Sequence, residues 1–590
     1  MKRLLLYVHF NKYGLINPHV YYQLEKLRPL FEKVLFISNS SVGFDSLEKL
    51  RESQLVDDVL LRENKGFDFA AWRDGFHKLG FDHVSMYDSV TLMNDTCFGP
   101  LWDLEPIYHN FEENDQVDFW GMTNNRASEL HPEHIQSYFV VYKQKILRSN
   151  SFIEYWTHIK DYEDVQEVID TYETQTTSYF NHLGFQSAVV FNTVNRPVYN
   201  QLPPDFSLYQ PTDLLKERVP LFKVKITEAN NAIAPYLLDY ISENSDYPLD
   251  LMLHHLSDVF LPDEPYKLGQ KYLKEKVFQG SKQKIAVHLH VFYTDLLQDF
   301  LNAFKSFDFL YDLFITTDSE AKQLEIAQIL EENNSKANIV VNGNVGRDII
   351  PMLKLKKELS QYDIIGHFHT KKSKEADFWA GESWRNELIE SMILTANSTL
   401  ENLKADTLGL VIADIPTFFR YNKIVDAGNE ALIAPIMNDL WKRMNLKKSI
   451  DFESYQTFVM SYGTFVWFKY DALKPLFELG MDENEIPSEP LPQNSILHAM
   501  ERMLIYIAWN QHYDFRIAPS PKRITPFVDN KILNKKQATP VLQTFADFSQ
   551  IGGAKGALKY WYSANVNTFK FLSKKVLKKI LNRLRKESTC

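Results

Sequence analysis

Cysteine is nearly absent from this chain, which has Cys97 and Cys590 among its 590 residues. Two thiols cannot build the disulfide framework of a small secreted domain, so the sequence favours a reducing, cytoplasmic location. A run of 18 apolar residues is also missing, and we therefore expect no membrane-spanning helix. The apolar start of the chain lacks the small-residue cleavage site of a signal peptide, and we interpret residues 4–10 as a buried first strand.

The two halves of the chain present the same motifs in the same order, about 280 residues apart. The first half contains Val8-His9-Phe10, Asn64-Lys65-Gly66-Phe67-Asp68, Met93-Asn94-Asp95, Phe139-Val140-Val141-Tyr142-Lys143 and Glu173, and the second half contains Val287-His288-Leu289, Asn344-Val345-Gly346-Arg347-Asp348, Phe368-His369-Thr370, Phe465-Val466-Trp467-Phe468-Lys469 and Glu501. A period of this length is far longer than that of solenoid repeats but matches a domain. The sequence therefore predicts a duplicated domain.

Short apolar runs alternate with helical patterns in both halves, which predicts parallel sheets with helices on both faces. Strands are expected at 4–10, 33–38, 89–93, 285–290, 313–316, 338–341 and 364–367, and helices at 21–31, 70–79, 296–304, 321–332 and 352–359. We assign residues 1–270 to the first α/β domain and 283–535 to the second. The stretch 203–281 is less periodic, and we expect it to end the first domain and connect the two. A loop-rich run at 482–494 precedes the Glu501 helix, and we align it with 165–172.

The end of the chain differs in charge from the rest. The last 36 residues carry a net charge of +9, whereas residues 1–554 carry −20. Five apolar residues recur there at helical spacing, namely Phe569, Leu572, Val576, Ile580 and Leu584, and the aromatic residues Trp561 and Tyr562 lie just upstream. A basic amphipathic helix over 555–590 is typical of a segment that lies on a membrane surface. The alternative is a last helix that packs on the protein. The acidic body argues against a nucleic-acid partner.

Polar residues follow the strand at 89–93, and ligands of open parallel sheets bind beyond the carboxyl ends of strands. The turn Asn94-Asp95-Thr96 can hold a divalent cation that bridges a diphosphate. An ordinary turn or helix cap would use the same residue types. In the turn from Asn64 to Asp68, Gly66 permits a positive φ or the close approach of a ligand, although a plain loop is an equal alternative.

Taken together, these two turns resemble the nucleotide-binding half of GT-A glycosyltransferases. The run from Asn64 to Arg73, the pair Asn94-Asp95 and the duplicated second half are similar to the rhamnan synthesis protein F family, over about residues 1–520. The resemblance implies two tandem GT-A-like domains. It also implies an inverting enzyme that transfers L-rhamnose from dTDP-L-rhamnose to a lipid-linked polysaccharide. Such an enzyme would work at the inner face of the cell membrane, beside other polysaccharide-synthesis enzymes. The two domains would make two linkages, or one would only hold the acceptor.

The resemblance also implies that Asn64, Gly66, Asp68 and Asp95 bind the donor, with Asp95 meeting Mg²⁺ or Mn²⁺. The strand ends and matching turns of the repeat add further donor-binding candidates: His9 and Asn94 in the first half, and His288, Asn344, Gly346, Arg347, Asp348, His367 and His369 in the second. A full Asp-x-Asp motif is absent, so metal dependence stays open. In the second half Thr370 replaces Asp95, and we expect the histidines, Arg347, Lys371 and Lys372 to neutralise a diphosphate without a metal. Metal ligation by His367 and His369, or a plain polar loop, are the alternatives. His9 and His288 lie near the nucleobase or are buried, hydrogen-bonded histidines.

An inverting transfer needs a base that takes the proton of the acceptor hydroxyl. We expect Glu173 in the first half and Glu501 in the second to be these bases. The alternative is that each glutamate complements a helix dipole from the first helical turn. Asp68 and Asp348 are rival bases. Four aromatic residues are candidates for sugar stacking: Trp72, Trp120, Trp384 and Tyr138.

Two other function classes compete with this hypothesis. A non-catalytic polysaccharide-binding assembly factor would explain why the second half lacks an acidic turn. A glycoside hydrolase would also use paired carboxylates, but it would need no nucleotide and no glycine turn before an acidic strand end.

Overall fold

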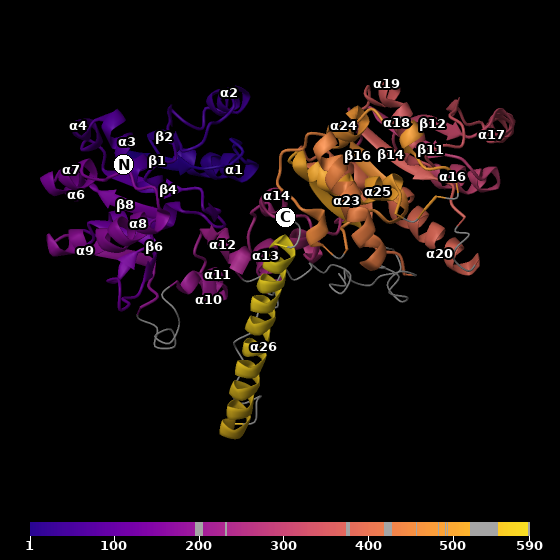
Figure 1. Cartoon of the computed structure of the whole chain (residues 1–590). Helices are drawn as coiled ribbons and strands as arrows, with labels where there is room; N and C mark the ends of the chain where they lie inside the picture. The colour runs from indigo at the N-terminus through magenta and orange to yellow at the C-terminus, as the bar shows by residue number, and fades with distance from the viewer. Residues whose placement is uncertain are drawn as a thin grey trace. The chain divides into compact units, whose positions relative to one another are not determined.

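The structure is a computed structural model of the chain (Figure 1). It describes all residues except 195–204, 230–232, 373–377, 418–426, 456, 482, 490, 493, 520–552 and 588–590. The chain forms two compact units, Met1–Asn534 and Lys535–Cys590. The predicted end of the second domain, residue 535, lies outside the described residues, and both domain boundaries stay predictions.

The first sheet is mostly parallel, with one antiparallel strand in its interior. Its strand order is β3-β2-β1-β4-β8-β6-β7, with β9 beside β6. The strands are β1 (Arg3–His9), β2 (Lys33–Ser38), β3 (Asp58–Leu61), β4 (Ser89–Asn94), β6 (Phe119–Asn125), β7 (His134–Ile135), β8 (Phe139–Lys143) and β9 (Ser187–Phe191). β8 runs antiparallel to both β4 and β6. The predicted strand at 33–38 has the bounds of β2.

Every residue of β1 is buried, because helices cover both faces of the sheet. Alternate residues point to opposite faces: Leu4 and Leu6 pack in one core with α3 (Phe67–Leu79), and Leu5 and Tyr7 in another with α1 (Pro18–Leu27). This two-sided burial explains why the strand is a continuous apolar run in the sequence.

The second sheet repeats the first. Its strand order is β13-β12-β11-β14-β16-β15-β17. The strands are β11 (Ile285–His290), β12 (Asp312–Thr317), β13 (Asn338–Val341), β14 (Ile364–His369), β15 (Leu408–Ala413), β16 (Val466–Lys469) and β17 (Asp514–Ala518). β16 is antiparallel and lies between β14 and β15, as β8 lies between β4 and β6. The prediction of two α/β domains with mostly parallel sheets is confirmed.

The strand register corrects one alignment between the halves. In the first sheet Val8 pairs with Asn94, and in the second His290 pairs with His369. If Asn94 and His369 correspond, then His290 is the counterpart of Val8 near the end of β1. His288, two residues earlier, cannot then be the counterpart of His9. The shared Val-His dipeptide therefore misaligned His9 with His288. Hydrogen bonds fix the register of a strand, whereas a two-residue motif does not.

The stretch predicted to be irregular is largely helical. It contains α10 (Phe206–Tyr209), α11 (Pro211–Lys216), α12 (Lys225–Ala229), α13 (Ala234–Asn244), α14 (Leu249–Val259) and α15 (Asp263–Tyr266). Tyr266 and Tyr272, which follow α14, pack in the core of the second sheet. The expected loop at 165–172 is also helical, since α8 (Val165–Val168), the π-helical turn η2 (Ile169–Glu173) and α9 (Thr174–His182) follow one another directly.

The basic end of the chain forms the predicted helix, α26 (Gly553–Glu587). Among the described residues, no helix is both long enough and apolar enough to cross a bilayer.

Candidate active site

The turn after β4 lies where three elements of the first sheet meet. The Asn94 side-chain amide donates a hydrogen bond to Asp68 Oδ2 at 2.7 Å, which ties the turn to the start of α3. The backbone N–H of Phe10, just after β1, donates to Asp95 Oδ2 at 3.0 Å. Asn94, Asp95 and Asp68 are therefore brought together at the carboxyl edge of the sheet, as the sequence predicted.

Burial and a neighbouring carboxylate make Asp95 hard to ionise. Burial raises the pKa of Asp95 to about 7, the Phe10 N–H opposes this shift, and the charge of Asp68 adds to it. The Asn94 side-chain oxygen accepts hydrogen bonds from Thr96, so it is already engaged. No group of three or more His, Cys, Asp or Glu within the described part of the chain could hold a metal ion. A metal at Asp95 would have to take most of its ligands from a bound diphosphate.

Both glycine turns use a positive φ, the conformation that the sequence analysis allowed at Gly66. Gly66 (φ +67°) precedes α3, and Gly346 (φ +82°) lies just before α18 (Ile349–Lys354). A Cβ atom at Gly66 would lie 2.5 Å from Ala70 Cβ, so a larger residue would strain the turn. Asn64 is half-buried in its turn, whereas Asn344 is exposed.

His9 is a buried, hydrogen-bonded histidine. Its Nδ1 lies 3.1 Å from Ser38 Oγ and its Nε2 lies 3.1 Å from the Leu15 carbonyl oxygen. Burial lowers the pKa of His9 to about 4, so the ring is neutral at physiological pH. Of the two alternatives for His9, this geometry fits the structural one.

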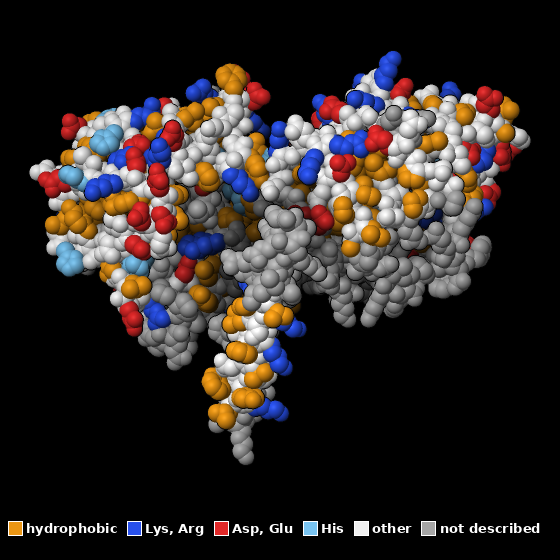
Figure 2. Space-filling model, in the orientation of Figure 1, with side chains coloured by type: hydrophobic (Ala, Val, Ile, Leu, Met, Phe, Trp, Pro, Cys, Tyr) orange, Lys and Arg blue, Asp and Glu red, His pale blue; other side chains and the backbone are white. Residues whose placement is uncertain are grey.

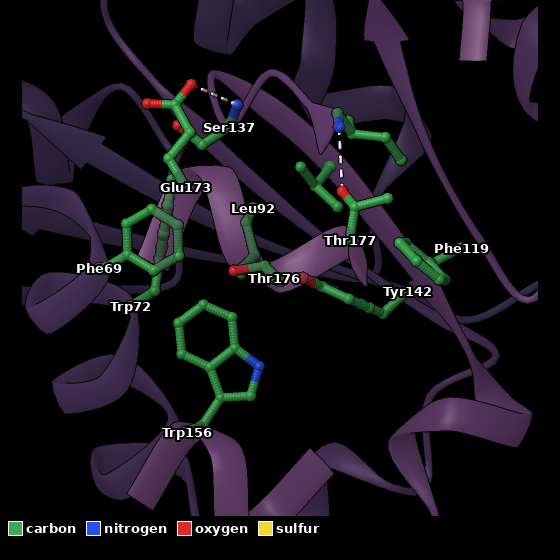
Figure 3. Close-up of a pocket in the computed structure, with 12 residues that line it drawn as sticks. Phe69, Trp72, Leu92, Phe119, Ser137, Tyr142, Trp156, Glu173, Thr176 and Thr177 are labelled. Carbon is green, nitrogen blue, oxygen red and sulfur yellow. Dashed lines mark hydrogen bonds between the residues drawn. The ribbon is translucent and has the colours of Figure 1, made fainter. Parts of the chain in front are cut away.

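Glu173 ends the π-helical turn η2 inside a continuous helical run, so the alternative that it complements a helix dipole from the first turn does not fit. Its Oε1 accepts a hydrogen bond from the Ser137 backbone N–H at 3.2 Å (Figure 3). π-Helical turns are often found at functional sites. Tyr138, the residue after Ser137, accepts a hydrogen bond on its carbonyl oxygen from the Asn94 backbone N–H at 3.3 Å, so the loop that Glu173 contacts also contacts the start of the turn after β4.

A small cavity lies under Glu173, but it does not bind sugar. Its volume is about 20 Å³, enough for one water molecule. Its walls are mostly apolar and include Phe69, Trp72, Phe119, Tyr142 and Trp156. The Glu173 carboxylate points away from these rings toward Ser137 (Figure 3). The glutamate therefore faces the loop before β8, and an acceptor would have to approach it from there.

Two lysines that the sequence analysis missed lie beside the turn after β4. β10 (Phe222–Lys223) pairs with β5 (Cys97–Phe98), and the Val224 N–H donates to the Thr96 carbonyl oxygen at 2.9 Å. Lys223 and Lys225 both approach Asp205 Oδ2, at 3.6 and 2.7 Å. No sequence pattern connected these lysines to Asp95, because only the β5–β10 pairing brings them together.

In the second half, histidines fill the equivalent place. His288 and His367 are buried and stacked, with their Nδ1 atoms 2.8 Å apart. His367 Nε2 lies 3.2 Å from Asp348 Oδ2, which also accepts a hydrogen bond from the Thr464 hydroxyl. His369 Nε2 donates to the Gly463 carbonyl oxygen at 2.7 Å. These histidines are bonded within the protein, and among the described residues they form no metal cluster.

The cations predicted to meet a diphosphate in the second half have partners within the protein. Arg347 pairs with Glu489 at 2.9 Å, and Lys372 pairs with Asp295. The Lys371 ammonium lies 3.4 Å from the centroid of the Trp384 ring. A ligand would have to replace these contacts, which the sequence could not show.

Thr370 replaces Asp95 in structure as well as in sequence. Its hydroxyl oxygen accepts hydrogen bonds from the backbone N–H groups of Phe292 and Tyr293, both at 3.0 Å. In the first half the corresponding N–H, that of Phe10, goes to the Asp95 carboxylate. A hydroxyl oxygen has two lone pairs, and both are used here. Thr370 therefore has no lone pair left for a metal ion.

Glu501 makes the same contact as Glu173. Its Oε1 accepts a hydrogen bond from the Gly463 backbone N–H at 2.9 Å, and Gly463 and Ser137 each precede the phenylalanine of their motif by two residues. Glu501 lies in the second turn of α25 (Ile496–Asn510), so the alternative that it complements a helix dipole from the first turn does not fit it either.

Three of the four aromatic candidates for sugar stacking are buried: Trp72, Trp120 and Tyr138. Trp72 and Trp120 belong to the cores on either side of the sheet. Trp384 is half-buried beside Lys371. A position near a predicted loop therefore did not distinguish aromatic residues of the core from aromatic residues that a sugar could reach.

The buried histidines predict an acid-sensitive second half. Burial lowers the pKa of His290 to about 4 and that of His288 well below its usual value near 6.5. Between about pH 6.5 and 4, the unfolded chain binds protons at these sites and the folded chain does not, so stability falls as the pH falls. Asparagine at position 290 can keep the bond to the Thr316 hydroxyl but does not titrate. Between pH 7 and 5, the free energy of unfolding of His290→Asn should therefore fall by about 2 kcal/mol less than that of wild type. Urea unfolding at both pH values tests this; an equal loss in the variant would refute it.

The profile of the family described as "Rhamnan synthesis protein F" matches residues 34–513. The uncharacterized protein y4gN of Sinorhizobium fredii is 29% identical over 227 residues, which are 38% of this chain and 51% of that protein. The uncharacterized protein WxcX of Xanthomonas campestris is 24% identical over 223 residues, 37% of this chain and 30% of that protein. This chain thus spans about half of the first relative and less than a third of the second.

Among solved structures, the chain is similar to the glycosyltransferase GlyE of Streptococcus pneumoniae. The identity is 14%, the TM-score is 0.22, and the match covers 63% of this chain and 87% of that one. A TM-score this low says nothing about function.

Proposed function

Because this chain belongs to the rhamnan synthesis protein F family, we propose that it is a glycosyltransferase of polysaccharide synthesis that uses an activated-sugar donor. We assign the donor as dTDP-L-rhamnose and the acceptor as a lipid-linked rhamnose chain, and the enzyme would act beside other polysaccharide-synthesis enzymes. One observation carries the proposal. Backbone contacts hold the Ser137–Tyr138 loop, which Glu173 bonds, and the segment of Lys223 and Lys225 against the Asp95 turn, beyond the carboxyl ends of β1 and β4 where ligands of such sheets bind.

The reaction proposed for the first half is an inverting displacement. The acceptor oxygen bonds to the anomeric carbon as the bond from that carbon to the diphosphate breaks. Glu173 takes the proton of the acceptor hydroxyl, and the nucleoside diphosphate leaves with the bonding electron pair. A base placed in this way is typically worth about 10²–10⁴-fold in rate. Asp95 would help to place the diphosphate, alone or with a metal ion bound jointly by the substrate.

For the second half, we propose a role in holding the acceptor chain. Its three candidate cations are paired within the protein, and Thr370 has no lone pair for a metal. A second linkage activity at Glu501 is the competing possibility that the same experiment tests.

The direct test combines the purified protein with dTDP-L-rhamnose and a lipid-linked rhamnosyl acceptor. Rhamnose should be added to the acceptor, with release of dTDP. If Glu501→Gln leaves the linkages of the product unchanged, the second half holds the acceptor; if it removes one linkage, that half is an enzyme. No transfer with any nucleotide-rhamnose donor would contradict the proposal, and hydrolysis of the polymer without nucleotide would favour the glycoside hydrolase.

The terminal helix α26 supports a place at the inner face of the cell membrane. Most of its exposed apolar side chains lie on one side and its described lysines on another (Figure 2), although Phe571 and Leu577 fall outside the apolar side. The apolar stripe consists of Leu558, Tyr562, Phe569, Leu572 and Val576, whose spacings of four, seven, three and four residues keep them on one face of a helix. Acidic residues are absent between Lys555 and Lys586, so an anionic lipid surface complements the helix better than a second copy of it would.

We predict that the protein binds anionic phosphatidylglycerol vesicles through this helix. Each base near an anionic leaflet is worth about 1 kcal/mol. Replacing Lys559, Lys570, Lys574 and Lys575 by glutamine should therefore weaken binding by roughly 10²–10³-fold. Deleting residues 555–590 should abolish it. Sedimentation with vesicles measures both effects, with phosphatidylcholine vesicles as the uncharged control, and unchanged sedimentation of the deletion variant would refute the prediction.

A further inference from the structure

Lys223 and Lys225 form a pair of positive charges at the edge of the first sheet, and neither belongs to a motif of the repeat. Lys223 is the last residue of β10, beside Cys97, and Lys225 is the first residue of α12. The β5–β10 pairing holds this segment next to the Asp95 turn. Backbone hydrogen bonds thus fix the points from which the two lysine side chains extend.

The two lysines share one carboxylate oxygen. Asp205 Oδ2 is 2.7 Å from Lys225 Nζ and 3.6 Å from Lys223 Nζ. The other oxygen, Oδ1, accepts hydrogen bonds from Gln136 and from the Ser207 hydroxyl. One carboxylate balances only one of the two charges. Glu173 adds a longer-range attraction to both lysines.

Lys223 is placed where an unbalanced charge is costly. Its side chain is 10% exposed, and its ammonium lies 5.1 Å from the centroid of the Tyr138 ring. Burial lowers the pKa of Lys223, whereas that of Lys225, which is half exposed, is raised because the attraction of Asp205 outweighs burial. An anion bound here would compensate a buried cation, which favours binding in a way that solvated lysines do not.

We infer that Lys223 and Lys225 bind the diphosphate of the nucleotide donor and stabilise it as the leaving group. The inference rests on the proposed function, since it names the ligand class of the same site. It explains how the site can work although Asp95 is the one acidic residue of its turn. In an Asp-x-Asp site a bound metal ion supplies the positive charge that neutralises the diphosphate, and here the two lysines supply that charge. Both ammonium groups donate hydrogen bonds to phosphate oxygens, and Asp205 orients them until the ligand arrives.

The test is binding of dTDP and dTMP to the full-length protein, measured by calorimetry in the presence of EDTA. Wild type should bind dTDP without a metal. Lys225→Gln and Lys223→Gln should each weaken dTDP binding by about tenfold or more and dTMP binding by less. Asp205→Asn, which can keep its bonds to Gln136 and Ser207, should strengthen dTDP binding because it removes the competing anion.

Lys145→Gln is the matched control. Lys145 pairs with Asp118 at 2.9 Å and is 67% exposed, so it resembles Lys225. It follows the antiparallel strand β8, whose last residue pairs with the first residue of β4, so it lies at the amino ends of the parallel strands and away from the Asp95 turn. This variant should bind dTDP like wild type. Thermal unfolding of every variant shows whether a loss of binding is caused by a loss of fold. Lys225→Gln is the more informative of the two lysine variants, because Lys225 is more exposed than Lys223 and its replacement should disturb the fold less.

The outcomes separate this inference from the proposed function. If wild type binds dTDP and both lysine variants bind it equally well, the lysine assignment is wrong and the glycosyltransferase proposal stands. If wild type binds dTDP with a metal but not in EDTA, the metal-independent role of the lysines is also wrong. If wild type binds no nucleotide under either condition, both proposals fall. Weaker dTDP binding in Asp205→Asn would show that the cluster only supports the fold.

Discussion

Replacing Glu173 by glutamine should lower the rate of sugar transfer by about 10²–10⁴-fold while the protein stays folded. Glutamine has nearly the same shape, and its side-chain oxygen can still accept the Ser137 N–H that Glu173 now accepts at 3.2 Å. The substitution therefore removes the base and keeps the hydrogen bond. Initial rates with saturating donor and acceptor measure the effect, and thermal unfolding checks the fold.

Alanine at the same position provides the contrast. Glu173→Ala removes both the base and the acceptor of the Ser137 N–H, so it should lose activity and some stability. If the glutamine variant is as active as wild type and only the alanine variant is impaired, then Glu173 positions the loop and another group is the base. Asp68, beside the same turn, would be the next residue to change.

Replacing Asp514 by asparagine should reduce the free energy of unfolding by about 3–5 kcal/mol, the usual cost of removing one partner of a buried ion pair. The Asp514 side chain is 1% exposed and bonds both Lys271, which is 0% exposed, and Arg516. Asparagine would leave these two cations against Asp250, which is itself largely exposed. Burial already lowers the pKa of Lys271 to about 7, so it can lose its proton and relieve part of the cost.

Asp250→Asn is the control for this prediction. Asp250 lies 2.9 Å from Arg516, but its side chain is 61% exposed, and exposed ion pairs contribute about 1 kcal/mol or less. Urea unfolding followed by tryptophan fluorescence compares the two variants. Equal losses in both would mean that burial of the pair does not decide its contribution.

Local pattern predicted most of the fold. The strands at 285–290 and 338–341 have the bounds of β11 and β13. β11 is a buried parallel strand, and β13 is a half-exposed edge strand that is still recognisable by its run of β-branched residues. The helices between 206 and 266 were missed, since they are short and broken by prolines, and tertiary packing stabilises them more than their own periodicity does.

The candidate site was predicted where its residues follow strands. Asn94, Asp95 and Asp68 meet as expected, because parallel strands end at one edge of a sheet. Lys223 and Lys225 were missed because a distant pairing, β5 with β10, carries them there. Arg347 and Lys372 were expected to bind a diphosphate, whereas in the structure they pair with Glu489 and Asp295. The sequence could not predict these ion pairs, because a charged residue in a loop does not reveal its partner.

Glu173 and Glu501 each accept a hydrogen bond from a backbone N–H of the loop before the antiparallel strand, β8 in the first half and β16 in the second. The two N–H groups, of Ser137 and Gly463, lie at matching positions in the repeat. Natural selection for a foldable loop would thus preserve this acid even in a half that had lost its chemistry. An acidic residue at this position in a diverged homologue is consequently weak evidence of activity. The turn after β4 or β14, which holds Asp95 in the first half and Thr370 in the second, would be the better place to look for a difference between an active and an inactive half.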